Sequence, residues 1–184
     1  MTMTATYPLS SSHSKPSAIL KDIGVVLGAS LVIALSGQLS IPLPFTPVPL
    51  VLQSHVILFF AAMLGSRRGF FAVLAFLMQG LMGLPVFASG SIGLLALLGP
   101  TGGYLLGYLM AAWTTGWMME NAKERTVKST ALALISGNLA IYLFGLPWLS
   151  FFIGFKAALI FGFLPFIAGD FLKIVLAMKG LKRG

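Results

Sequence analysis

The sequence has no cysteine, and only 9% of its 184 residues are charged, with four acids against twelve lysines and arginines. Without cysteine the chain has neither disulfides nor thiol chemistry. A soluble domain usually carries about 25% charged residues, so this chain has too little polar surface to coat a globule in water. Because 58% of its residues are hydrophobic, we expect one integral membrane domain whose solvent is lipid.

The shortage of acids and histidines excludes most enzyme chemistry. Asp170 is the only acid away from the tail and the cytoplasmic side, so hydrolysis by paired carboxylates lacks its second group. His55 is the sole histidine in an apolar run, and one histidine with one acid cannot form a usual metal site. Residues 99–103 are glycine-rich but lack the Walker lysine, so the chain carries no ATPase of its own. A serine hydrolase in which His55 activates Ser89 or Ser91 stays an alternative.

The apolar runs predict an all-α membrane protein with six transmembrane helices. The predicted helices are residues 18–39, 49–64, 69–84, 102–119, 129–146 and 165–178. Residues 1–17, rich in serine and threonine, are predicted to be a disordered tail, and 18–184 a single domain. The first run also has small residues at the spacing of a signal-peptide cleavage site, which is the alternative to a retained helix.

The end of the chain is the least regular part of this pattern. Residues 147–178 are too long for one helix and are interrupted at 162–165. Because proline suits the first turn of a helix, the last helix is predicted to begin near Pro165. Residues 147–163 then lie along the interface or cap the bundle, and Lys156 is interpreted as an interfacial lysine.

Basic residues fall on one side of this six-helix topology. Ten of the twelve lie before or in the first turn of the first helix, between the second and third, between the fourth and fifth, or after the sixth: Lys15, Lys21, Arg67, Arg68, Lys123, Arg125, Lys128, Lys179, Lys182 and Arg183. The opposite segments, 40–48 and 85–101, carry no charge. The cations are therefore interpreted as topology determinants rather than a nucleic-acid surface, with both termini in the cytoplasm.

The two uncharged outer segments are apolar and rich in proline and glycine. Residues 41–49 alternate proline with bulky side chains, and 99–104 read Gly-Pro-Thr-Gly-Gly-Tyr. Irregular backbone of this kind beside a membrane is buried in protein or lines a cavity. The segments are therefore either a structural plug over the bundle or the lid and wall of a ligand site.

Polar residues of the predicted helices gather at the same outer depth. Asp170 and Lys173 share a helix face and either neutralise each other or receive a polar ligand, the lysine attracting a carboxylate and the aspartate accepting from N–H groups. A charge within a membrane helix costs roughly 2.5–3.5 kcal/mol, so it usually faces the interior. The full set of candidate ligand contacts is Asp170, Lys173, Gln53, Gln79, Asn138, Tyr104, Tyr142, Phe45, Thr46, Phe87, Ser89 and Thr101.

Small residues recur at four-residue spacing along the first predicted helix. They are Gly24 and Gly28, and Ser30 and Ala34. Such pairs let helices approach closely. The four residues indicate either internal packing or a docking face for a separate membrane partner.

Four motifs in this order resemble the BioY family. They are residues 41–49 followed by Gln53, residues 83–88, residues 99–104, and Pro165-Phe166 with Gly169-Asp170 and Lys173. The resemblance runs from about residue 27 to 177. Members of the family are biotin-binding S-components of energy-coupling factor (ECF) transporters. Val51 departs from the pattern, because many members have threonine there, and a hydroxyl contact at this position is therefore not expected.

The resemblance implies a fold and a set of partners. It implies the six-helix S-component fold in a bacterial inner membrane, with biotin bound near the outer face under the first outer loop and no cofactor. Asp170 and Lys173 would be the main polar ligand set. The implied partners are a transmembrane coupling subunit and two ABC-type ATPase subunits. An S-component for another vitamin, such as riboflavin or thiamine, stays the alternative.

Overall fold

The computed structural model describes residues 16–167, which form a helical bundle. Its helices are α1 (Pro16–Gly37), α2 (Gln53–Leu81), α3 (Gly93–Leu98), α4 (Gly102–Glu120), α5 (Val127–Ile153) and α6 (Phe155–Gly162). The connections hold a 3-10 turn, η1 (Ala88–Gly90), and an antiparallel strand pair, β1 (Ser40–Ile41) and β2 (Leu50–Val51). The all-α prediction is confirmed, since the two strands have two residues each. Asp170, Lys173 and almost all of the predicted tail lie outside the described residues.

The predicted helices correspond largely to those of the structure. Residues 18–39 and 102–119 correspond to α1 and α4, and residues 49–64 and 69–84 to the two halves of α2, which bends at Gly65 (φ 86°). Within residues 16–167, two helices are long and apolar enough to cross a membrane, Ser17–Gly37 and Val127–Ile153. Gln53–Leu64 and Phe155–Ile167 are shorter apolar helices. The count of six membrane crossings stays a prediction.

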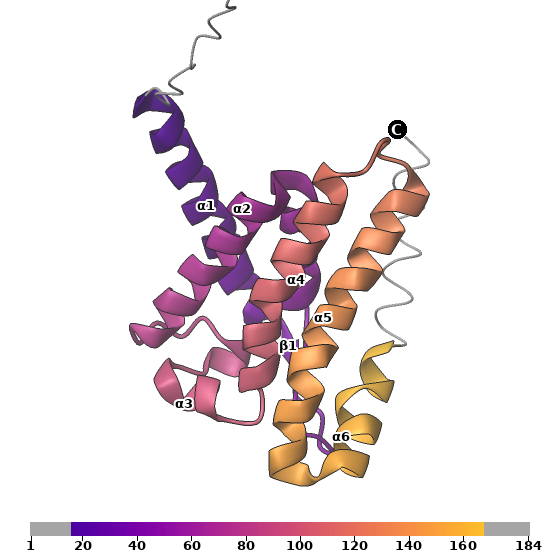
Figure 1. Ribbon diagram of the computed structural model, residues 1–184. Helices are drawn as coiled ribbons and strands as arrows, with labels where there is room; N and C mark the ends of the chain where they lie inside the picture. The colour runs from indigo at the N-terminus through magenta and orange to yellow at the C-terminus, as the bar shows by residue number, and fades with distance from the viewer. Residues whose placement is uncertain (1–15, 168–184) are drawn as a thin grey trace, which may run out of the picture.

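The predicted end of the fifth helix at Leu146 is wrong, because α5 continues through Pro147 to Ile153. Proline is tolerated inside membrane helices, and here it removes only the one backbone bond that would join residue 147 to the Leu143 carbonyl. The helix ends instead at Gly154, whose φ of 81° favours glycine. Residues 155–162 are a separate helix that runs back along α5 (Figure 1), so residues 147–163 are not the single segment that was predicted.

The bundle is ordered by close approaches at small residues. α4 lies between α2 and α5, while α1 packs on α2 and α6 on α5 (Figure 1). A Cβ added at Gly116 of α4 would collide with the backbone of Gly65 and Ser66, and one at Gly107 would lie 2.9 Å from the Ile141 backbone. Glycine at these points lets helix backbones touch, which is how membrane helices gain packing without a hydrophobic driving force between them.

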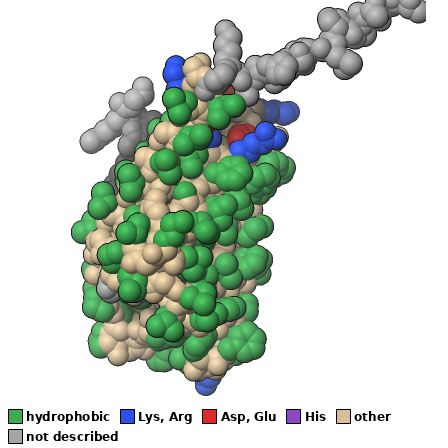
Figure 2. All heavy atoms as spheres, turned by 90° about the vertical axis from the view of Figure 1, so that its left-hand side faces the viewer, with side chains coloured by type: hydrophobic (Ala, Val, Ile, Leu, Met, Phe, Trp, Pro, Cys, Tyr) green, Lys and Arg blue, Asp and Glu red, His purple; other side chains and the backbone are tan. Residues whose placement is uncertain are grey.

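Most of the described charged residues gather at one end of the bundle, and apolar side chains cover its flank. The charged end holds the start of α1, the bend of α2 and the connection from α4 to α5, at the top of Figure 1. Below it, Figure 2 shows hydrophobic side chains over the face of the molecule. Phe151 is 86% exposed and Leu143 69%, as expected of side chains that face lipid. The segments between α1 and α2 and between α2 and α4 lie at the opposite end.

Glu120 at the end of α4 caps the second half of α2. Its carboxylate accepts a hydrogen bond from the Ser66 backbone N–H at 2.8 Å and another from the Ser66 hydroxyl at 2.7 Å. The first N–H groups of a helix have no partner within it, and a negative charge is favourable there. The carboxylate therefore ties α4 to the bend at Gly65.

We expect Glu120→Ala to lower the free energy of unfolding by about 1–2 kcal/mol, since it removes a helix cap. Thermal unfolding in detergent measures the change. Asp22→Ala is the control: it breaks the Asp22–Arg68 ion pair (2.6 Å), whose side chains are about half exposed, and should cost at most about 1 kcal/mol. A loss no greater for Glu120→Ala than for the control would contradict the capping role.

Candidate ligand-binding site

A cavity of about 580 Å³ lies at the end of the bundle opposite most of the described charged residues. Its walls come from three parts of the chain: residues 42–51 of the first outer segment, residues 87–101 of the second, and the facing sides of α2, α4 and α5. Phe166 closes the side next to α6. The volume lies within the roughly 300–1,000 Å³ of small-molecule sites, and the lining is mostly apolar with a few polar groups.

Gln53 at the start of α2 is the most deeply buried polar group of the cavity, with only 1% of its surface exposed. Its Nε2 donates to the carbonyl of Ile33 at 3.2 Å and to that of Val86 at 3.3 Å. Since both partners are acceptors, they fix which end of the amide is nitrogen. The Oε1 atom is therefore the end that is left to accept a hydrogen bond from a ligand.

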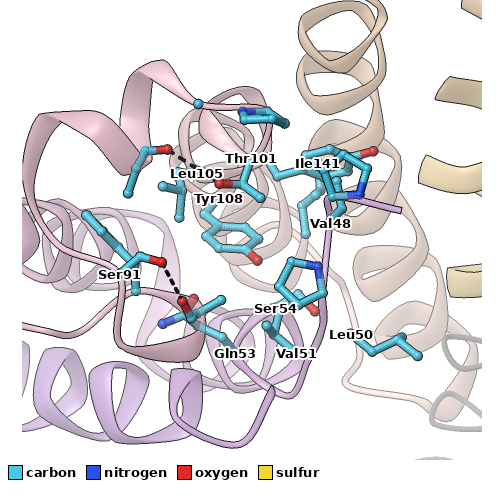
Figure 3. A pocket seen from close by; sticks show the side chains of 18 of the residues that line it. Val48, Leu50, Val51, Gln53, Ser54, Ser91, Thr101, Leu105, Tyr108 and Ile141 are labelled. Carbon is cyan, nitrogen blue, oxygen red and sulfur yellow. Dashed lines mark hydrogen bonds between the residues drawn. The ribbon is translucent and has the colours of Figure 1, made fainter. Parts of the chain in front are cut away.

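Tyrosines of α4 and an amide of α5 face the cavity from the other side. Tyr104 and Tyr108 are one turn apart and both buried, and Figure 3 shows Tyr108 projecting toward Gln53 and Ser54. Asn138 and Tyr142 are likewise one turn apart on α5. Within residues 16–167 the Asn138 side chain has no protein hydrogen bond, so its amide can both donate to a ligand and accept from it.

The apolar wall is built on close aromatic packing. The Phe87 ring lies edge-on to Phe76, with centroids 5.5 Å apart, and fills the space over Gly80. Thr46 and Thr101 line the cavity, but their hydroxyls also form local hydrogen bonds. Thr46 accepts from the Val48 N–H at 3.2 Å, and Thr101 donates to the Ala96 carbonyl at 3.4 Å. The two threonines therefore shape the loops at least as much as they offer ligand contacts.

The structure brings together seven of the twelve predicted ligand contacts: Gln53, Thr46, Phe87, Thr101, Tyr104, Asn138 and Tyr142. Phe45 lies outside the lining and is 51% exposed, with its ring 6.1 Å from that of Phe161. Gln79 also lies elsewhere, because its Nε2 donates to the Ser30 hydroxyl at 2.9 Å between α1 and α2. Asp170, Lys173 and the side chain of Ser89 lie outside the described part of the chain.

The four small residues of α1 do not share one face. Gly24 and Gly28 are exposed, and a Cβ added at either would meet nothing within 4 Å. Ser30 and Ala34 are buried against the rest of the bundle instead. The structure thus places Ser30 and Ala34 in internal packing and leaves only the two glycines on an open surface.

Several lining residues were not predicted from the sequence, among them Tyr108, Leu105 and Ile141. Tyr108 had a usable signal, since it follows Tyr104 by one helical turn and so shares its face. For the hydrolase alternative, the Ser91 hydroxyl donates to the Ala88 carbonyl at 2.8 Å, and His55 Nδ1 is 3.1 Å from the Ser54 hydroxyl. The serine and the histidine that the hydrolase alternative needs to pair are therefore each bonded to a neighbour instead.

This fold and cavity define a helical membrane protein with a cavity of small-molecule size at one end of its bundle. A sequence model of the BioY family matches residues 5–183. The chain belongs to the BioY family.

Individual relatives agree with this assignment. Biotin transporter BioY2 of Lactococcus lactis subsp. cremoris (strain MG1363) is 35% identical over 154 residues, which are 83% of this chain and 82% of that protein. Biotin transporter BioY of Rhizobium etli is 36% identical over 160 residues, 82% of this chain and 85% of the relative. A crystal structure of the S-component for biotin from an ECF-type ABC transporter superposes with a TM-score of 0.81 at 30% identity, covering 92% of this chain and 93% of that one.

Proposed function

We propose that this chain is the membrane subunit that captures biotin for import by an ECF-type transporter. The observation that carries the proposal is the cavity of about 580 Å³ between the two uncharged outer segments and the helices. Membership of a family whose relatives are biotin transporters supports the choice of ligand. The chain acts as a transporter subunit and not as an enzyme.

The lining suits the chemistry of biotin. Biotin has a ureido group with two N–H donors and one carbonyl acceptor, an apolar ring that contains sulfur, and a flexible carboxylate tail. Gln53 Oε1 and the Asn138 amide supply an acceptor and a group that both donates and accepts. Phe87, Tyr104 and Tyr142 supply flat apolar walls for the ring and tail.

Lys173 and Asp170, beyond the described residues, complete the proposed site as its charged pair. We expect Lys173→Ala to weaken biotin binding by about 1.5–3 kcal/mol, because a hydrogen bond between a lysine and a carboxylate is charge-assisted. Calorimetric titration in detergent measures the change. Lys156→Ala is the control, since this lysine of α6 is exposed and does not line the cavity. Unchanged affinity in Lys173→Ala would remove the lysine from the site.

The proposed arrangement in the membrane has six crossings, with both termini in the cytoplasm and the cavity toward the outside of a bacterial inner membrane. The segregation of basic residues to the end opposite the cavity supports this orientation. The proposed partners are a transmembrane coupling subunit and two ABC-type ATPases, which supply the energy that this chain cannot. Such an assembly is supported by the similar crystal structure, which is that of a component of an ECF-type ABC transporter.

The open glycines of α1 are the proposed docking contact for the coupling subunit. We expect Gly28→Leu to impair biotin uptake by the whole transporter several-fold while leaving biotin binding by the isolated chain intact, since Gly28 is exposed and a Cβ added there meets no described atom within 4 Å. Uptake by cells and titration of the purified chain are compared. Equal loss of uptake and binding would indicate ordinary packing.

Titration of the purified chain with biotin, with riboflavin and thiamine as controls, tests the function itself. We expect saturable one-to-one binding of biotin alone, with submicromolar affinity. If a folded sample binds none of the three vitamins, the proposed function is wrong and the ligand of the cavity is another solute. Binding of riboflavin or thiamine instead of biotin would replace the proposed ligand.

A further inference from the structure

The hydroxyl of Tyr104 forms a hydrogen bond with the protein backbone, although the residue lines the cavity. It donates to the backbone carbonyl of Gly162, the last residue of α6, at 2.9 Å. Carbonyls at a helix end lack a partner within their own helix, so this bond satisfies a group that would otherwise be buried without one. It joins α4 to α6 across 58 residues of sequence.

Two glycines hold Tyr104 in this position. A Cβ added at Gly145 of α5 would lie 2.5 Å from the Tyr104 ring, and one at Gly162 would lie 2.6 Å from its hydroxyl oxygen. The ring therefore sits against the α5 backbone with little freedom to turn. The hydroxyl is directed at the one place where α6 ends.

The residues that follow Gly162 support the cavity wall and contribute Phe166 to it. Phe163 packs edge-on against Tyr142, with ring centroids 4.8 Å apart, and Phe166 lines the cavity directly. Their positions depend on where the chain leaves α6, because a shift of the break at Gly162 moves every residue after it. The break itself has no regular helical geometry, since Phe163 has φ −125° and ψ −56°.

We propose that Tyr104 is a positioning residue for ligand binding: its hydroxyl holds the end of α6 at Gly162 and thereby places Phe163 against Tyr142 and Phe166 in the wall of the cavity. The role differs from the direct ligand contact expected of Tyr104 from the sequence. It rests on the proposed function for its ligand, biotin, while the placement of the wall is testable with no ligand present.

Because the chain has no cysteine, two introduced cysteines report on this placement without background. Nitroxide labels at Met110→Cys of α4 and Leu164→Cys, both exposed, give the distance between α4 and the wall by pulsed electron paramagnetic resonance. We expect Tyr104→Phe, which keeps the ring, to broaden or shift this distance distribution. Thr114→Val is the matched control, since its hydroxyl donates to carbonyls of α4 itself, and it should leave the distribution unchanged.

Biotin titration of the same variants completes the test. We expect Tyr104→Phe to bind biotin on the order of three- to tenfold more weakly, the range for one lost neutral hydrogen bond, and Thr114→Val to bind as the parent does. In a Phe166→Leu background the effect of Tyr104→Phe should shrink to less than about twofold, since coupled sites are not additive.

The outcomes separate the two proposals. Weaker binding with an unchanged distance distribution would mean that the hydroxyl contacts the ligand, which overturns the positioning role. A changed distribution with unchanged affinity overturns it as well, because the wall would then not matter for binding. Absence of biotin binding in the parent chain would instead refute the proposed function, while the distances would still report whether the hydroxyl holds the wall.

Discussion

Gln53→Leu should lower biotin affinity by roughly tenfold or more and the free energy of unfolding by about 1–3 kcal/mol. The substitution removes the hydrogen bond to the buried Val86 carbonyl, whereas the Ile33 carbonyl keeps its bond from the Ser36 hydroxyl. It also removes Oε1, the acceptor proposed for the ureido group. The same amide links the end of α1, the start of α2 and the second outer segment, so stability and binding should fall together.

Gln38→Leu is the matched control for this prediction. Gln38 Nε2 donates to the Pro85 carbonyl at 2.7 Å, one residue before Val86, but this bond is exposed to solvent or headgroups. A carbonyl released there finds other partners, so both losses should be small. Titration calorimetry and thermal unfolding in detergent measure the two effects. Equal losses for the two variants, or none for Gln53→Leu, would contradict the bridging role.

Gly116→Ala should destabilise the protein by about 1–3 kcal/mol, although alanine is the better helix former. The added methyl group would collide with the backbone of Gly65 and Ser66, and backbone cannot move aside as a flexible side chain can. α4 and the bend of α2 would have to separate. The bond from Glu120 to Ser66 lies at the same crossing and should weaken with it.

Gly28→Ala is the opposite case on α1, because the new methyl group meets no atom within 4 Å. At Gly28 only the higher helix propensity of alanine acts, and it should stabilise the protein by up to about 1 kcal/mol. The two substitutions are the same chemical change in two membrane helices, so their difference isolates packing. Thermal unfolding of both variants in one detergent measures it. A Gly116→Ala protein as stable as Gly28→Ala would show that the helices do not touch at this crossing.

Much of the fold and part of the site could be predicted from composition and pattern. The scarcity of charge required a membrane domain, and the distribution of lysine and arginine separated the charged end from the end that carries the cavity. The apolar, proline-rich segment 41–49 could not be an ordinary exposed loop, and most of it lines the cavity. Four-residue spacing placed Asn138 and Tyr142 on one face, as the structure confirms.

The end of α5 could not be predicted in the same way. Proline predicts a break because it removes one backbone donor, but a membrane helix continues when neighbouring groups satisfy the carbonyl left free. α5 continues through Pro147, and the break falls at Gly154, whose φ of 81° favours glycine. Which of several prolines and glycines ends a helix depends on the packing around it, and a single sequence does not state that packing.

The sequence by itself determined that this protein is a helical membrane bundle with its basic residues mostly at one end. It also determined that uncharged segments rich in proline and glycine cover the other end. Only the tertiary structure decided which side of each helix faces inward, because lipid is as apolar as the protein interior and the hydrophobic pattern therefore does not separate the two. For that reason Gln79 pairs with Ser30 away from the cavity, Phe45 lies outside the lining, and the Tyr104 hydroxyl binds Gly162. Each of these contacts joins residues far apart in sequence, and only packing brings them together.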